Sequence, residues 1–243
     1  MIVARFRRWA SESFLRAEHQ NLGNIVRLLE PGGPETGVVD LGYDDGSRTA
    51  LFARAVGTTR VHGLEIVEER AQLARGRGIE VEAADLNARL PFEESTFDVV
   101  CSNQVIEHVH DTDTFTGEVF RILKPGGYAV VSTENLASWH NIGALALGWQ
   151  PFSLTNVSKV ALGLWNPVAL HRGVAETPLP SWQHMRVFSY RGLRELFDLH
   201  GFDVEALVGA GYYLPAQVAR LDGRHAAFLA LKARRPVGTG PAV

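Results

Sequence analysis

Residues 38–47 read VVDLGYDDGS, a short apolar run that ends in an acid and a turn containing two glycines. Gly42 and Gly46 allow a tight turn and a close approach of the backbone to a ligand. A helix is predicted to begin near Ser47, so its N-terminal N–H groups would face the same place. The stretch therefore predicts a buried strand, a ligand-binding loop and a helix, in that order.

The chain between residue 38 and residue 135 alternates between short apolar runs and helical patterns. Strands are expected at GVVDLG, RVHGLEI, IEVEAAD, FDVVCSN and GYAVVSTEN, with helices in between, and KPGG at residues 124–127 is expected to form a tight turn. Short strands separated by helices of this length require right-handed crossovers and a parallel sheet. Farther on, a helix at SYRGLRELFDLHG and strands at FDVEALVGAG and HAAFLALKAR complete a predicted α/β domain.

Composition bounds the function. The 243 residues are 46% hydrophobic and 21% charged, as in a soluble globular protein, and the net charge of −3 argues against a nucleic-acid partner. The basic end LKARRP is interpreted as a solvated end of the last strand. The single cysteine, Cys101, lies in an apolar run and is expected to be a buried strand residue. With no secretory signal and no apolar run long enough to span a bilayer, we predict a cytoplasmic protein.

The strand and helix rhythm stops after Asn135. Residues 136–185 are rich in aromatic residues, Gly, Pro and Asn, and are predicted to be an inserted segment that binds or covers the acceptor. The remaining domain is expected to comprise residues 1–135 and 186–235, followed by a disordered tail at 236–243. Four tryptophans lie in the insertion, where they could line a pocket, form a small core or make a dimer contact: Trp139, Trp149, Trp165 and Trp182.

Two cofactor classes compete for the glycine loop. A dinucleotide loop needs the pattern G-x-G-x-x-G, whose second and third glycines are missing here. Glu65, at the end of the second strand, suits the ribose hydroxyls of either class. Asp85, after the third strand, could accept a hydrogen bond from an adenine amine, and Asp40 could orient the methionine part of a sulfonium cofactor. Asp85 therefore favours the sulfonium cofactor.

The stretches VVDLGYDDGS, GLEI, AADLNARLPFEESTFDVVCSNQVIEHV and RILKPGGYAVVSTEN, in this order, resemble class I S-adenosylmethionine-dependent methyltransferases. The resemblance is closest to small-molecule methyltransferases with Glu-His after the fourth strand. It implies a Rossmann-like, seven-stranded, mostly parallel sheet with helices on both faces and an antiparallel last strand. It also implies S-adenosylmethionine as the cofactor and a small-molecule acceptor.

The resemblance assigns binding roles along the chain. The loop residues would face the cofactor, the end of the second strand its ribose, the residues after the third strand its adenine, and the end of the fourth strand its methionine. In that order these residues are Asp40, Gly42 and Gly46; Glu65 and Ile66; Asp85 and Leu86; Asn103 and Gln104. The chain departs from the family at Asp44, where glycine is usual. An acid there could attract the positive charges of the cofactor, and we expect a functional variant of the loop.

Chemistry is predicted for Glu107 and His108, which follow the fourth strand. If the acceptor is a hydroxyl, a histidine base or a divalent metal ion could take or loosen its proton. The stretch QVIEH resembles the E-x-x-E-H half-site of some metal-dependent methyltransferases, with Gln104 in the first position. His140 or His184 could complete a site for Mg²⁺ or a transition metal. A structural role for His108, packed under the cofactor or bonded to the backbone, is the third alternative.

The acceptor is expected to lie against the insertion, where SWQHMRVFS places His184 and Arg186 on one side of an extended chain. The leading hypothesis is O-methylation of a small molecule, with a sugar or glycan precursor as the narrow form. A nucleotide-dependent oxidoreductase and a non-catalytic cofactor-binding scaffold are the alternatives. The sequence leaves the oligomeric state open, with a dimer as a candidate.

Overall fold

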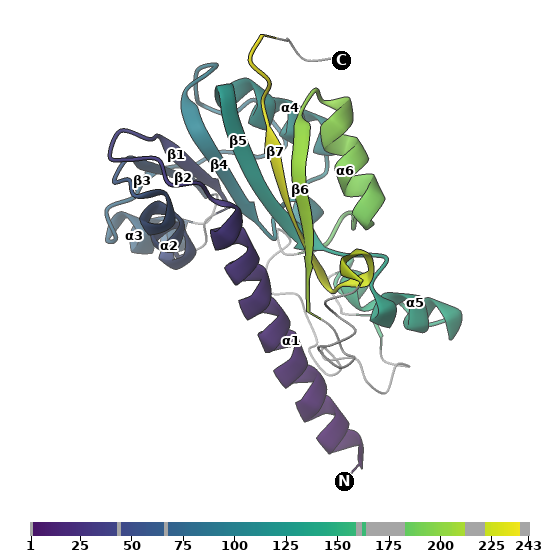
Figure 1. The fold of residues 1–243 in the computed structure, drawn as a ribbon. Helices are drawn as coiled ribbons and strands as arrows, with labels where there is room; N and C mark the ends of the chain where they lie inside the picture. The colour runs from purple at the N-terminus through teal and green to yellow at the C-terminus, as the bar shows by residue number, and fades with distance from the viewer. Residues whose placement is uncertain are drawn as a thin grey trace.

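The computed structural model describes residues 2–42, 45–65, 68–158, 162–163, 183–211 and 222–238. One sheet carries the fold, in the order β3-β2-β1-β4-β5-β7-β6 (Figure 1). Its strands are β1 (Val38–Leu41), β2 (Val61–Leu64), β3 (Glu80–Glu82), β4 (Phe97–Asn103), β5 (Leu123–Glu134), β6 (Asp203–Ala210) and β7 (Phe228–Arg234). The first five are parallel, and β7 runs antiparallel to both β5 and β6. This arrangement confirms the expected fold class.

Helices cover both faces of the sheet. They are α1 (Ile2–Leu28), α2 (Ser47–Val56), α3 (Glu68–Arg75), α4 (Thr112–Ile122), α5 (Trp139–Ala146) and α6 (Tyr190–Leu199), with short 3₁₀ helices η1 (Ile106–His108), η2 (Phe152–Leu154) and η4 (Gly223–His225). Figure 1 shows that α1 is long and that its N-terminal half extends beyond the sheet. None of the described helices is both long and apolar enough to cross a membrane.

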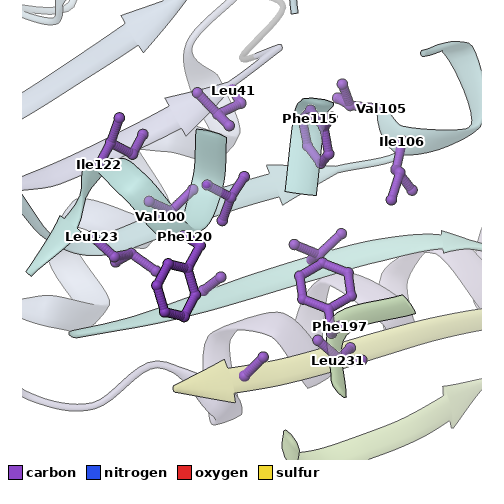
Figure 2. Close-up of a cluster of buried hydrophobic side chains, with 14 of the residues drawn as sticks. Leu41, Val100, Val105, Ile106, Phe115, Phe120, Ile122, Leu123, Phe197 and Leu231 are labelled. Carbon is purple, nitrogen blue, oxygen red and sulfur yellow. The ribbon is translucent and has the colours of Figure 1, made fainter. Parts of the chain in front are cut away.

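The alternation of side chains along each strand divides the core into two layers. On one face, Phe115 and Phe120 of α4 and Phe197 of α6 pack with Val100 of β4 and Leu231 of β7 (Figure 2). On the other face, α1 and α2 pack against the neighbouring positions of the same strands, including the buried Cys101. Successive strand residues point to opposite faces, so a strand covered on both sides is apolar throughout. The interpretation of Cys101 as a buried strand residue is therefore confirmed.

Two local expectations are wrong. The KPGG sequence does not separate α4 from its strand, because β5 already begins at Leu123, and its pairing with β4 shifts register between Phe97 and Val99. Gly126 has a φ of 84°, so the glycines form an irregularity inside the strand. The basic end of β7 is not solvated either: Arg235 is 7% exposed and donates to the carbonyl oxygens of Phe120 and Leu123.

The insertion contains more regular structure than its sequence indicated. Helix α5 and the 3₁₀ helix η2 occupy much of its described part. Trp139, at the start of α5, is 44% exposed and donates from Nε1 to Asp222 at 3.1 Å. Its ring also packs against His225, with the centroids 4.5 Å apart. Trp165 and Trp182 lie outside the described residues, as do residues 239–243 of the predicted tail.

Candidate active site

Asp40 lies in β1, one residue before the strand ends, and its side chain is buried. The Thr49 hydroxyl of α2 donates to its carboxylate at 2.6 Å. Burial raises the pKa of Asp40 to about 7, against the lowering effect of the Thr49 hydrogen bond. Asp40 therefore links β1 to α2 across the loop, which is the position that a residue needs to orient the loop backbone.

Glycine is required at both ends of the loop. Gly42 has a φ of 75°, and a Cβ atom there would lie 2.5 Å from a methyl group of Val105. Gly46 has a φ of 77°, and its Cβ atom would meet Ile79 at 2.6 Å. Side chains rarely adopt these φ values, and contacts this short force a rearrangement. Asp44, the unusual acid between the two glycines, lies outside the described residues.

The next two strands end beside this loop. Glu65 follows β2 and donates its backbone N–H to the Glu82 carbonyl at 3.1 Å, while Ile66 lies outside the described residues. Asp85 is exposed, and its Oδ1 accepts from the backbone and the side chain of Asn87 at 2.9 and 2.8 Å. These bonds lower the pKa of Asp85, so its carboxylate is charged at neutral pH. Leu86 packs partly buried against the core.

Sequence reasoning missed Asn87, which connects two edges of the predicted cofactor site. Its Oδ1 accepts from the backbone N–H groups of His110 and Asp111, at 2.6 and 3.1 Å. The loop after β3 is thereby fixed to the loop after β4. An Asn two residues after an Asp is a common turn pattern and does not by itself indicate a longer-range role. The partner of Asn87, His110, lies 23 residues farther along, so the sequence gives no sign of this bond.

A polar network joins the end of β4 to α1. Ser132 of β5 donates to Asn103 Oδ1 at 2.7 Å, and Asn21 of α1 donates to Ser132 at 2.9 Å. Gln104 has a φ of 58°, and its amide, oriented to satisfy both ends, donates to Glu107 Oε1 at 3.1 Å and accepts from the Thr133 backbone N–H at 3.3 Å. The two residues predicted at the methionine end are thus held by α1 and β5.

Glu107, His108 and His184 come together beyond the carboxyl end of β4. One ligand atom from each lies within 4.8 Å of the others. Glu107 is fully buried in η1, and Thr133 of β5 donates to its Oε2 at 2.8 Å. The backbone N–H of Met185 donates to the Glu107 carbonyl at 2.7 Å, which holds the segment carrying His184 against η1.

Both histidines of this cluster are oriented by main-chain carbonyls. His108 Nδ1 lies 3.1 Å from the Gln183 oxygen, and His184 Nδ1 lies 2.7 Å from the Ser153 oxygen. Because a carbonyl oxygen only accepts, each Nδ1 must carry a proton, and the neutral form of each ring has its lone pair at Nε2. The cluster therefore offers two imidazole lone pairs beside one carboxyl group.

Burial shifts the pKa values of Glu107 and His108. It raises the pKa of Glu107 to about 7, partly offset by nearby His184, and it lowers the pKa of His108 to about 4. Glu134, at the end of β5, lies 3.8 Å from His184 Nδ1 and was not singled out from the sequence. Its position in the unremarkable stretch VSTEN explains why it was missed.

His140 lies in α5 and is not among the residues whose ligand atoms converge in the cluster of Glu107, His108 and His184. Its Nε2 lies 3.2 Å from Ser138 Oγ, and its ring packs edge to face on Phe152 with the centroids 5.5 Å apart. Burial lowers the pKa of His140 to about 3. The structure thus brings together His184 and the Glu-His pair, and it places His140 in the packing of the insertion.

The sheet with its antiparallel β7, the glycine loop after β1 and the acids after β2 and β3 define a methyltransferase domain of the Rossmann-like type. The sequence profile of a family described as "Methyltransferase domain" matches residues 11–207. The protein therefore belongs to the class I S-adenosylmethionine-dependent methyltransferases, a family whose cofactor is S-adenosylmethionine.

Several known proteins are similar to this chain. A Mycolicibacterium smegmatis protein named "Probable S-adenosylmethionine-dependent methyltransferase" is 30% identical, over 84% of this chain and 66% of its own length. The ubiquinone/menaquinone biosynthesis C-methyltransferase of Desulfotalea psychrophila is 35% identical over 44% of each chain. The mitochondrial ubiquinone biosynthesis O-methyltransferase of Bos taurus is 31% identical over 47% of this chain and 34% of its own.

The chain thus spans less than two thirds of the length of these curated relatives. Among solved structures, the methyltransferase in a complex with the Trm112 activator of Haloferax volcanii superposes with a TM-score of 0.63. That likeness covers 98% of this chain and 95% of the other at 20% identity, so it concerns the fold alone. The acceptor of this protein therefore has to be argued from its own site.

Proposed function

We propose that the protein transfers the methyl group of S-adenosylmethionine to a hydroxyl group of a small-molecule acceptor. The cluster of Glu107, His108 and His184 carries this proposal. It lies beyond the same sheet edge as the predicted cofactor loop, because the parallel strands β1, β4 and β5 all end there. A hydroxyl acceptor needs a group that removes its proton, whereas the thioether leaving group needs no proton transfer.

In this reaction the acceptor oxygen attacks the methyl carbon in line with the sulfonium. The new O–CH₃ bond takes its electron pair from oxygen, and the S–CH₃ pair returns to sulfur, which gives S-adenosylhomocysteine. The leaving group is already good, so the enzyme contributes mainly by aligning the two reactants. The remaining requirement is to remove the proton of the acceptor hydroxyl.

The charges in the cluster fit that requirement. A general base works best when its pKa lies near the operating pH, and burial brings the pKa of Glu107 to about 7. His108 stays neutral at that pH because its pKa is lowered. We infer that Glu107, His108 and His184 together accept or loosen the acceptor proton, and that Asn103 and Gln104 lie against the methionine part of the cofactor.

A narrower proposal concerns the acceptor. The partly exposed indole of Trp139, next to Asp222 and His225, offers an apolar face with polar neighbours, which is how proteins often bind sugar rings. This favours a carbohydrate over a nucleic acid in a chain with a net charge of −3. The relatives include both a C- and an O-methyltransferase. O-methylation is therefore proposed from the site and not from the relatives. We also propose a cytoplasmic location and a dimer.

Calorimetry with S-adenosylmethionine, S-adenosylhomocysteine and NADH tests the cofactor first. Binding of the sulfonium and its product, without NADH, is expected; binding of NADH alone would support an oxidoreductase, and no binding a scaffold. A homocysteine-release assay across sugars, phenols, amines and carbon acids then tests the acceptor. Turnover confined to amines or carbon acids would contradict the hydroxyl proposal.

A further inference from the structure

We propose that Glu107, His108 and His184 bind a divalent transition-metal ion such as Zn²⁺ or Mn²⁺, and that this ion binds the acceptor hydroxyl. The inference deepens the proposed function and rests on it for the role of the ion, although metal binding can be measured without turnover. It goes beyond the sequence motif, because His184 lies far from the Glu-His pair and only the fold brings it there.

The donor set is of the kind that holds a catalytic metal ion. Two imidazole nitrogens and one carboxylate oxygen lie within 4.8 Å of one another. Ligand atoms bound at about 2.0–2.1 Å in a tetrahedral site are roughly 3.3 Å apart, so an ion would draw these side chains together by up to about 1.5 Å. His108 and His184 are only partly buried, which leaves their rings room to move.

Each ligand is already oriented by a second group. The Gln183 carbonyl oxygen accepts from His108 Nδ1–H, and the Ser153 carbonyl oxygen accepts from His184 Nδ1–H. In each ring, Nε2 is then the nitrogen whose lone pair can bind a metal ion. A histidine that ligates a metal almost always donates its other N–H in this way. Thr133 fixes one oxygen of the Glu107 carboxylate at 2.8 Å.

Gln104 has an explanation in this arrangement. Here its amide lies 3.1 Å from Glu107 Oε1 and orients that carboxylate instead of binding the ion. Glu134, 3.8 Å from His184 Nδ1, supplies a second negative charge close by. When both are ionised, the carboxylates of Glu107 and Glu134 balance the charge of a divalent ion.

The ligand types select the ion. Imidazole suits Zn²⁺ and other first-row transition metals, whereas Mg²⁺ and Ca²⁺ prefer an all-oxygen shell. Three protein ligands leave at least one coordination position for an acceptor oxygen. Coordination lowers the pKa of a bound hydroxyl, so its proton can pass to solvent before the oxygen attacks the methyl carbon.

Isothermal titration of the full chain, freed of metal by a chelator, tests the inference with ZnCl₂, MnCl₂ and MgCl₂. We expect one Zn²⁺ or Mn²⁺ per chain, bound more tightly than Mg²⁺. Loss of a group that hydrogen-bonds to a metal ligand weakens metal affinity by roughly 10–100-fold, and His184→Ala, which removes a ligand itself, should weaken it more. Glu107→Gln, which keeps the shape of the side chain, is a second variant, and His110→Ala, an exposed histidine near by, is the matched control.

Absence of binding, equal binding by wild type and His184→Ala, or a preference for Mg²⁺ would overturn the inference. Thermal unfolding of each variant shows that it is folded. Binding of S-adenosylmethionine is measured on the same samples. If the cofactor binds and turnover survives chelation, the metal inference fails and the proposed function stands. If the cofactor does not bind, the proposed function fails, whatever the metal titration shows.

Discussion

The imidazole rings of His108 and His184 meet edge to face, with centroids 4.8 Å apart and planes inclined by 66°. The His108 ring follows the central strand β4, and the His184 ring lies near the end of the insertion between β5 and α6. Their contact places the end of the insertion on the proposed catalytic edge of the sheet. A change on the insertion side should therefore affect chemistry at the sheet.

His184→Ala is expected to lower kcat for methyl transfer by about 10²–10⁴-fold, the range that a lost acid–base group costs. The dissociation constant of S-adenosylmethionine should stay unchanged, because the partners of His184 are His108 after β4, Glu134 at the end of β5 and Ser153 of the insertion. Steady-state kinetics of homocysteine release, together with calorimetry, measures the two effects separately.

His140→Gln is the matched comparison for this variant. Both histidines were candidates from the sequence, but the His140 ring packs on Phe152 and is not part of the cluster of Glu107, His108 and His184. We expect this substitution to lower the thermal stability of the protein and to have little effect on kcat. A larger loss of kcat in His140→Gln than in His184→Ala would show that His140, and not His184, is the catalytic histidine.

Asp85→Ala is expected to weaken S-adenosylmethionine binding about tenfold, equivalent to about 1.4 kcal/mol, through loss of one hydrogen bond to the adenine amine. Both bonds from Asn87 use Oδ1 of Asp85, and the side chain is exposed at the strand edge. Glu82→Ala removes an exposed carboxylate of β3 and controls for the general loss of negative charge. Equal affinity losses in the two variants would argue against an adenine contact.

The fold was predictable because the chain alternates strands and helices, and because the strands at the centre of the sheet contain runs of apolar residues. The cofactor edge was predictable in part, because the acids follow strands that end at one edge. The sequence could name His184 only as one of two candidates to complete the Glu-His site, because its contact with His108 depends on the path of the insertion. Asn87 and Glu134 were missed because their partners lie far away in sequence. Arg235 was misread because a basic residue near a chain end is usually solvated, whereas here the guanidinium is buried against the end of α4, over the Phe120 ring.

Gly42→Ala is expected to destabilise the fold by about 2–4 kcal/mol and to weaken cofactor binding. Its φ of 75° costs roughly 1 kcal/mol for a residue with a Cβ atom, and the contact with Val105 at 2.5 Å adds a packing penalty. Gly57→Ala is the matched control, because Gly57 has a φ of 84° but open space around its Cβ position. Urea denaturation should show the smaller loss in Gly57→Ala; equal losses would mean that Val105 moves aside without cost.

Arg235→Ala is expected to lower the free energy of unfolding by about 2–4 kcal/mol. The guanidinium donates to several main-chain carbonyl oxygens at the end of α4, including those of Phe120 and Leu123 at 3.1 and 2.6 Å, and these acceptors would lose their partner in a buried place. Arg60→Ala, which removes a half-exposed arginine with a surface ion pair to Glu35, should cost less than about 1 kcal/mol. Comparable losses in urea denaturation would show that the Arg235 bonds contribute little.

Asp40→Asn tests the buried acid of the cofactor loop through pH. Burial raises the pKa of Asp40 from 3.8 to about 7, so the folded protein holds a proton that the unfolded chain has released. Stability from this group is fully present below pH 3.8 and is lost as the pH rises through 7. Without cofactor, wild type should therefore lose free energy of unfolding relative to Asp40→Asn between pH 5 and pH 8, on the order of 3 kcal/mol. Urea denaturation at each pH measures this difference. A difference that stays constant or grows in favour of wild type would mean that Asp40 is ionised in the folded protein.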